Sequence, residues 1–131
     1  MTKQELLQHV ADAFGTAPEY PWADTPDAFV LRHESNRKWF AVGMTVRRDR
    51  LGLGGEGTVD VVNFKCDPMM SGSYLSQPGI LPAYHMNKLH WLSVLLDGTA
   101  ADDDIRALLD TSFALTRQKP KRARKPGIPK E

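Results

Sequence analysis

The sequence has one cysteine and no long apolar run, and each of these features excludes certain classes of protein. Cys66 has no second cysteine to pair with, which excludes an internal disulfide and a cysteine-rich zinc site. No stretch of eighteen apolar residues is present, so we expect no membrane-spanning helix. The first residues are polar and lack the apolar core of a secretory signal. We therefore expect a soluble, cytoplasmic and monomeric protein.

Positive charge is scarce in most of the chain and concentrated at its end. Of the 17 Lys and Arg residues, seven fall in residues 117–131, where Glu131 is the only acid. Residues 1–116 hold the other ten bases and 15 of the 16 acids, so their formal charge is −5. With 41% hydrophobic residues in 131, the composition suits a single core. We expect one domain over residues 1–117, followed by a basic tail at 118–131 whose composition favours disorder.

Three helices are predicted from their end signals and their apolar spacing. A capping box of Thr and Glu predicts a helix over residues 3–14, with a glycine directly after it. An Asp-Pro pair predicts the start of a second helix, which covers residues 67–75. Three consecutive aspartates favour the positive end of a third helix, which begins between residues 99 and 102 and ends before Pro120.

Five strands are predicted from apolar runs that turn residues bound. They cover residues 29–33, 38–44, 58–65, 80–84 and 91–96. In the second strand, simple alternation places Phe40, Val42 and Met44 on one face. The resulting order is α-β-β-β-α-β-β-α. Helices beside a mostly antiparallel sheet must bury their single apolar stripes on one face of it, so the sequence predicts a two-layer α+β sandwich.

The stretch from Asn63 to Trp91 concentrates the polar side chains that are able to contact a ligand. It reads Asn-Phe-Lys-Cys-Asp-Pro and, ten residues later, Gly-Ile-Leu-Pro-Ala-Tyr-His-Met-Asn-Lys-Leu-His-Trp. This pairing resembles the signature of the MmcQ/YjbR family, small bacterial proteins usually described as DNA-binding. The positions that match are Lys65, Cys66, Asp67, Pro68, Pro82, Tyr84, His85, Asn87, Lys88, His90 and Trp91. Position 89 is commonly basic in the family and is Leu89 here, which weakens a phosphate contact at that point.

The resemblance covers about residues 3–116 and implies both a fold and a partner. The implied fold has the same order of elements and is akin to type III secretion chaperones and CyaY-like (frataxin-like) domains. The implied partner is DNA, bound through a double wing formed by the turn at 34–37 and the loop at 47–57. Cations from the wings and the tail are the candidate DNA contacts: Arg32, Arg37, Lys38, Arg47, Arg48, Arg50, Lys121, Arg122, Arg124 and Lys125. The alternative is that these are ordinary solvated charges of hairpins and a tail.

Two other functions remain open at this stage. The first is a small-molecule or enzyme-like pocket, formed if residues 84–90 make one helical turn before the last strand. Its candidate residues are Asn63, Lys65, His85, Asn87, Lys88, His90 and Trp91. The same side chains would instead be structural if they satisfy backbone groups where the chain enters the sheet. The second is a protein-interaction module of the secretion-chaperone type, which would use the face of the sheet.

Several familiar chemistries are disfavoured by spacing. The glycine-rich residues 52–57 match G-x-G-x-x-G but lack a buried strand before them and a helix after them, which predicts a hairpin loop. His85 and His90 are five residues apart, so they lie about 140° apart on a helix and on opposite faces of a strand. Asp67 opposes thiolate formation at Cys66. We therefore expect no catalytic residue, cofactor or metal, and the leading interpretation is a non-catalytic DNA-binding protein.

Overall fold

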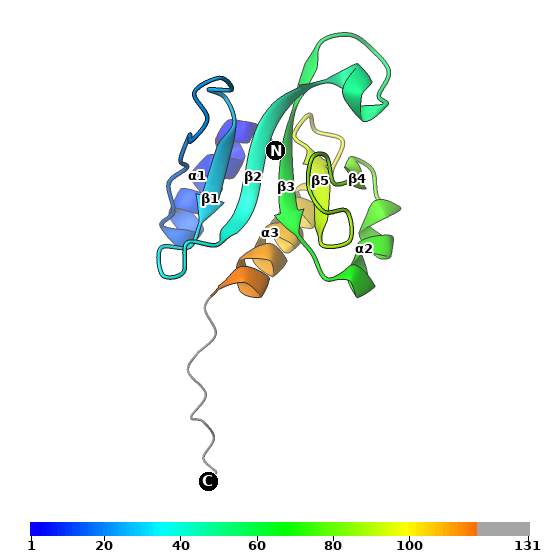
Figure 1. The fold of residues 1–131 in the computed structure, drawn as a ribbon. Helices are drawn as coiled ribbons and strands as arrows, with labels where there is room; N and C mark the ends of the chain where they lie inside the picture. Colours follow the sequence, from blue (N-terminus) through cyan, green and yellow to red (C-terminus); the bar gives the residue numbers. More distant parts are fainter. Residues whose placement is uncertain (118–131) are drawn as a thin grey trace.

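A five-stranded antiparallel sheet organises the molecule (Figure 1). The structure, a computed structural model, describes residues 1–117, so the predicted tail lies outside the described residues. The strands are β1 (Phe29–Arg32), β2 (Trp39–Arg47), β3 (Thr58–Lys65), β4 (Ile80–Pro82) and β5 (Trp91–Leu95). Their order across the sheet is β1-β2-β3-β5-β4, and every neighbouring pair is antiparallel. The predicted α+β class and order of elements are confirmed.

Three helices and one short 3-10 turn accompany the sheet. They are α1 (Lys3–Phe14), η1 (Arg48–Leu51), α2 (Pro68–Leu75) and α3 (Asp102–Thr116). Helices α1 and α3 lie behind the sheet in Figure 1, and α2 lies beside β4. Within residues 1–117, no helix is long and apolar enough to cross a membrane.

The helix ends follow from the residues that cap them. Thr2 accepts a hydrogen bond from the Glu5 amide at 3.1 Å and donates its own amide to the Glu5 carboxylate at 2.8 Å. The helix α1 stops at Gly15, whose φ of 64° suits a residue without a Cβ atom. Asp67 caps α2 by accepting from the Met69 amide at 3.0 Å. These local signals explain why sequence reasoning located both helices.

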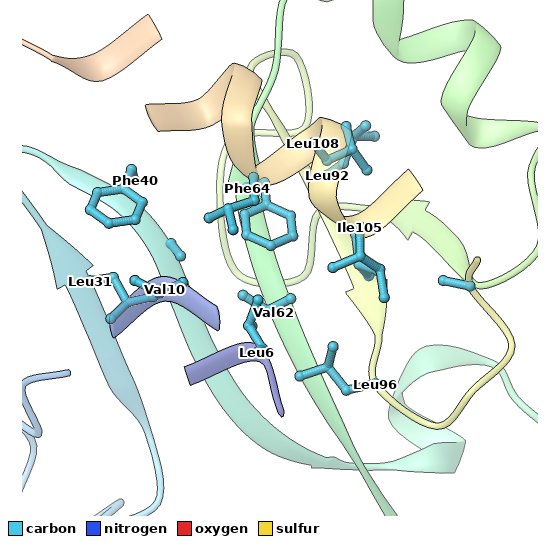
Figure 2. Close-up of a cluster of buried hydrophobic side chains, with 14 of the residues drawn as sticks. Leu6, Val10, Leu31, Phe40, Val62, Phe64, Leu92, Leu96, Ile105 and Leu108 are labelled. Carbon is cyan, nitrogen blue, oxygen red and sulfur yellow. The ribbon is translucent and has the colours of Figure 1, made fainter. Parts of the chain in front are cut away.

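The main core lies between the sheet and the helices α1 and α3. Figure 2 shows Leu6 and Val10 of α1 and Ile105 and Leu108 of α3 among the sheet side chains that they cover, Val62 included. All five of these side chains are at most 1% exposed. The C-terminal half of α3 adds an aromatic cluster, in which the Phe113 ring stacks on Phe14 with centroids 4.1 Å apart.

The start of β2 departs from simple alternation at Phe40, which corrects one prediction. The register between β1 and β2 shifts at Leu31 and Arg32, where a bulge lets Phe40 and Ala41 both face the helices. Val42 and Met44 face the other side of the sheet. The prediction that Phe40 shares a face with them is therefore wrong. A bulge depends on pairing with another strand, and the pattern of one strand does not reveal it.

Glycine at position 43 is required by close packing against β1. Gly43 pairs with Phe29, and an added Cβ atom would lie 2.0 Å from the Phe29 ring. The ring is 1% exposed and has no free space to move into. This contact sets the spacing of β1 and β2 above the helices.

Candidate functional site

A groove runs along β2 on the face of the sheet opposite α1 and α3. Its floor is β2 itself, and its walls are the loop at residues 22–28 and the segment at residues 84–86. The cavity volume is about 630 Å³. The side chains that line it are largely apolar or aromatic: Trp22, Pro26, Ala28, Trp39, Val42, Met44, Val46, Tyr84 and Met86. The polar residues of the lining include Asp27, Thr45, Arg47, Arg50 and His85.

Aromatic rings stand at two places along the groove. Trp22 and Trp39 meet edge to face, with ring centroids 5.9 Å apart, and Trp39 is 37% exposed. On the other wall, the rings of Tyr84 and His85 lie 4.0 Å apart. Trp39 and His85 are exposed and Trp22 and Tyr84 are half-buried, so these rings offer flat surfaces on which an apolar ligand can stack.

The second wall is held on the sheet by a closed set of buried hydrogen bonds. The side-chain amide of Asn63 donates through Nδ2 to the Tyr84 carbonyl at 2.9 Å, and the Ser93 hydroxyl donates to Asn63 Oδ1 at 2.5 Å. The Tyr84 amide in turn donates to Ser93 Oγ at 2.8 Å. Asn63 and Ser93 are both fully buried and are register partners of β3 and β5. This network fixes the backbone at the point where the chain begins to cover the open face of the sheet.

The rest of that segment satisfies its own backbone. Lys88 donates to the Ala83 carbonyl at 2.8 Å, and Asn87 accepts from the amides of Leu89 and His90. One turn closes at the end, where the Trp91 amide donates to the Asn87 carbonyl at 3.0 Å. The predicted helical turn therefore covers only residues 87–91.

His85 stands apart from that turn and reaches the groove. Its φ of 61° is the left-handed conformation, which excludes it from a right-handed helical turn. This backbone bend places its ring beside Tyr84 and into the lining of the groove. Of the seven predicted pocket residues, only His85 lines the groove.

The other predicted pocket residues are distributed elsewhere. Lys65, the last residue of β3, pairs with Trp91 of β5, and both side chains are half-buried. His90 is exposed, and its carbonyl accepts from the Cys66 amide at 2.8 Å. Burial, followed by the charge of Asp67, raises the pKa of the Cys66 thiol, which disfavours its thiolate form. Residues 1–117 contain no cluster of three His, Cys, Asp or Glu side chains arranged to hold a metal ion.

The two predicted DNA wings lie at opposite ends of β2. The turn at residues 34–37 precedes β2, and the loop at residues 48–57 follows it. The eight residue steps from Trp39 to Arg47 span about 27 Å of extended strand. A DNA contact that involves both wings would therefore have to extend along the length of β2.

Most of the wing cations are already bound within the fold. Arg32 donates two hydrogen bonds to the Glu19 carboxylate, and this interaction lowers the pKa of the Glu19 carboxyl. Arg47 binds Asp49 in the same manner, at 3.1 and 2.6 Å.

The remaining wing cations differ in the number of contacts that their side chains make within the fold. Arg48 donates to the Gly54 carbonyl at 2.7 Å and lies 3.6 Å from Asp97. Arg37 lies 3.6 Å from Glu19. Within residues 1–117, the side chains of Lys38 and Arg50 form no hydrogen bond or ion pair. These two exposed cations are thus the ones that the fold leaves available.

Sequence reasoning missed most of the groove. Trp22, Trp39, Met44 and Met86 were not among the predicted site residues, although Tyr84 belongs to the motif that was matched. The bulge in β2 hid the signal, since it places Trp39 on the same face as Val42 and Met44. The loop that carries Trp22 has no periodic pattern from which to predict its position.

Comparisons with known proteins identify the family. The family model described as YjbR matches residues 11–115. The chain belongs to the YjbR family. This confirms the resemblance to MmcQ/YjbR proteins that the motif at 63–91 indicated.

Relatives and solved structures agree with this assignment. The uncharacterised protein YyaQ of Bacillus subtilis (strain 168) is 41% identical over 117 residues, which are 89% of this chain and 99% of the relative. A crystal structure of a Pseudomonas syringae protein has 41% identity and a TM-score of 0.86, and the match covers 89% of this chain and all of that one. A DUF419 domain protein of Deinococcus radiodurans has 24% identity and a TM-score of 0.62, over 91% of this chain and 81% of that one, which shows the shared fold.

Proposed function

We propose that this YjbR protein is a non-catalytic binding protein whose ligand occupies the groove along β2. The observation that carries the proposal is the pair of aromatic walls, Trp22 with Trp39 and Tyr84 with His85, around a largely apolar cavity of about 630 Å³. A volume in this range suits a small organic molecule. The ligand expected there has a flat or extended apolar body that packs on these rings.

The groove is favoured over the predicted polar pocket because several side chains of that pocket already form hydrogen bonds within the fold. Asn63, Asn87 and Lys88 already bind backbone groups of their own chain. Freeing them would leave those groups unpaired, at a cost of about 1–3 kcal/mol for each buried one. The groove residues need no such rearrangement, since their apolar surfaces are already open.

A fluorescent probe with an apolar aromatic body tests this proposal. N-phenyl-1-naphthylamine is neutral and gains fluorescence when it leaves water for an apolar site. We expect saturable binding to the folded protein at one site per chain. Trp39→Ala should weaken binding about tenfold, because it removes one stacking surface.

The matched control separates the groove from other apolar surface. Met69 on α2 is 90% exposed and does not line the groove, so Met69→Ala should leave binding unchanged. Unsaturable binding, or equal loss in both variants, would contradict the proposal. Circular dichroism of each variant shows whether the fold is intact.

DNA binding is the second candidate, and the position where the described chain ends favours it. The Asn36 side chain donates to the Thr116 carbonyl at 2.9 Å, so α3 ends beside the turn that carries Arg37 and Lys38. Residues 118–131 then contribute six Lys or Arg and one acid. The turn that carries Arg37 and Lys38 thus lies beside the end of α3, to which this basic sequence is joined.

Salt dependence tests this second candidate. Deleting residues 118–131 removes six cations, which should reduce the slope of log K against log salt by about 5 on duplex DNA. Full-length and shortened protein are titrated with a labelled duplex at two salt concentrations. Absence of binding by the full-length protein at low salt would refute DNA binding. Equal binding by both forms would move the contact to Arg37, Lys38 and Arg50.

A further inference from the structure

We propose that the ligand of the groove carries an anionic group, and that Arg50 binds it. This inference rests on the proposed function, since it names the chemical class of ligand for the same cavity. The class is an organic acid: an apolar, flat or extended body joined to one carboxylate, sulfonate or phosphate.

The first step of the argument is the position of the charged residues along the groove. Arg47 and Arg50 line the groove where β2 passes into η1, whereas Trp39 lines it at the start of β2. The strand between Trp39 and Arg47 is about 27 Å long. The groove therefore has Trp39 towards one end and the arginines at the other, and the second aromatic wall includes Tyr84, which packs against the cluster of Val46. A ligand with one apolar part and one charged part would match this polarity.

The second step compares the three arginines that surround the cationic end. The guanidinium of Arg47 is bound at two points by Asp49, and that of Arg48 by the Gly54 carbonyl. An incoming anion would have to displace these partners. Arg50 forms no side-chain hydrogen bond or ion pair within residues 1–117, is exposed and lines the groove. Its charge helps to lower the pKa of the Asp49 carboxyl, but the two side chains form no ion pair. Arg50 can therefore bind an anion without breaking a hydrogen bond.

The third step is the balance of charge in the lining. Two arginines and one carboxylate, that of Asp27, line the groove. Asp49 forms an ion pair with Arg47, so the charged groups of the lining that form no ion pair within residues 1–117 are Arg50 and Asp27. Asp27 should repel an acidic ligand weakly, and removing its charge should strengthen the binding of such a ligand. This gives the proposal a second, opposite test.

The experiment compares two probes that share one aromatic framework. N-phenyl-1-naphthylamine is neutral, and 8-anilino-1-naphthalenesulfonate is the same framework with a sulfonate. We expect the sulfonate to bind about fivefold more tightly, as fits one partly solvated charge-assisted contact. Arg50→Gln should abolish this preference, so that the two probes bind with equal affinity. Asp27→Asn should increase the preference for the sulfonate.

Controls separate the specific contact from the net charge of the protein. Arg106 lies on α3, on the other side of the sheet, so Arg106→Gln makes the same change in net charge and should leave the preference intact. Arg50→Lys should retain part of the preference and shows that the position tolerates substitution.

The outcomes distinguish the two proposals. Equal affinity for both probes, or a sulfonate preference that survives Arg50→Gln, would overturn the assignment of Arg50 while leaving the groove proposal standing. Failure of both probes to bind would overturn both proposals.

Discussion

The two faces of the sheet are built from alternate residues of the same strands, yet they are closed in different ways. On the covered face, Val62 and Phe64 meet the apolar stripes of α1 and α3. The buried polar contacts of α3 on this face lie in its C-terminal half, where Ser112 binds the Phe40 carbonyl and the Lys65 amide. On the open face, a separate cluster that includes Val46, Val61 and Leu95 is covered by loops. The loop at 83–90 is attached through buried polar residues of the sheet.

The difference reflects what a helix and a loop can offer to a sheet. A helix satisfies its own backbone hydrogen bonds and presents an apolar stripe, so it can be attached mainly by apolar packing, to which α3 adds hydrogen bonds of Ser112. A loop has unpaired backbone groups, which need partners when they are buried. Asn63 and Ser93 supply these partners near β5. In the described part of the chain, residues 1–117, no equivalent attachment covers β2, and the groove lies there.

Removing an aromatic ring from the covered face should have the largest effect. Phe113 stacks on Phe14 and packs against Phe40 and His33. Phe113→Ala should reduce the free energy of unfolding by about 3 kcal/mol, at the lower end for such changes because the ring is only partly buried. Urea denaturation measures this. A loss below about 1 kcal/mol would show that the end of α3 contributes little to the core.

Adding one methyl group to the covered face should have the next largest effect. A Cβ atom at Gly43 would overlap the buried Phe29 ring, so Gly43→Ala should cost about 2 kcal/mol. Gly72 in α2 is the matched control, since nothing lies within 4 Å of an added Cβ there. Gly72→Ala should be neutral or slightly stabilising. Equal effects at the two positions would contradict the close packing of β1 on β2.

Breaking the polar attachment on the open face should have a smaller effect on stability but a clear effect on the groove. Ser93→Ala leaves Asn63 Oδ1 and the Tyr84 amide without their partner, which should cost about 1.5 kcal/mol. It should also weaken binding of the neutral probe, because Tyr84 belongs to the groove wall. Ser76→Ala is the control, on an exposed serine outside this network. Full affinity in Ser93→Ala would show that the wall does not depend on this bond.

The buried histidine on the covered face predicts a pH dependence. Burial lowers the pKa of His33, with the charge of Arg117 acting in the same direction and a hydrogen bond to the Phe113 backbone acting against it. The unfolded chain therefore takes up a proton near pH 6.5, before the folded chain does. Stability should be constant above this range and should fall as pH decreases from about 6.5 towards the lower folded pKa, by less than about 1.4 kcal/mol per pH unit.

The His33→Gln variant isolates this contribution. Urea denaturation at several pH values between 8 and 5 should show a shallower loss of stability in His33→Gln than in the parent protein. An identical pH profile would assign the effect to other groups.

The smallest effects should come from the exposed end of the loop. Asn87 accepts two backbone hydrogen bonds in a turn, so Asn87→Ala should cost about 0.5–1 kcal/mol. His90 is exposed, and we expect His90→Ala to change stability by less than about 0.5 kcal/mol. Thermal melting of both variants checks this. A large loss for His90→Ala would reveal a role that its exposed position does not suggest.

The sequence by itself determined the elements that local chemistry specifies. The capping box at Thr2, the glycine stop at Gly15 and the Asp67-Pro68 pair located helix ends, because these residues act on the backbone within one turn. Apolar runs located the strands, and their order with the helices predicted the α+β class. The motif from Asn63 to Trp91 identified the family.

The tertiary structure alone decided which side chains share a cavity. A bulge that depends on pairing with β1 placed Trp39 beside Val42, and a loop without periodicity brought Trp22 against Trp39. Asn63 became a structural residue because β5 placed Ser93 next to it. Such contacts join residues up to several tens of positions apart, and their geometry follows from strand register and packing rather than from the pattern of any one segment.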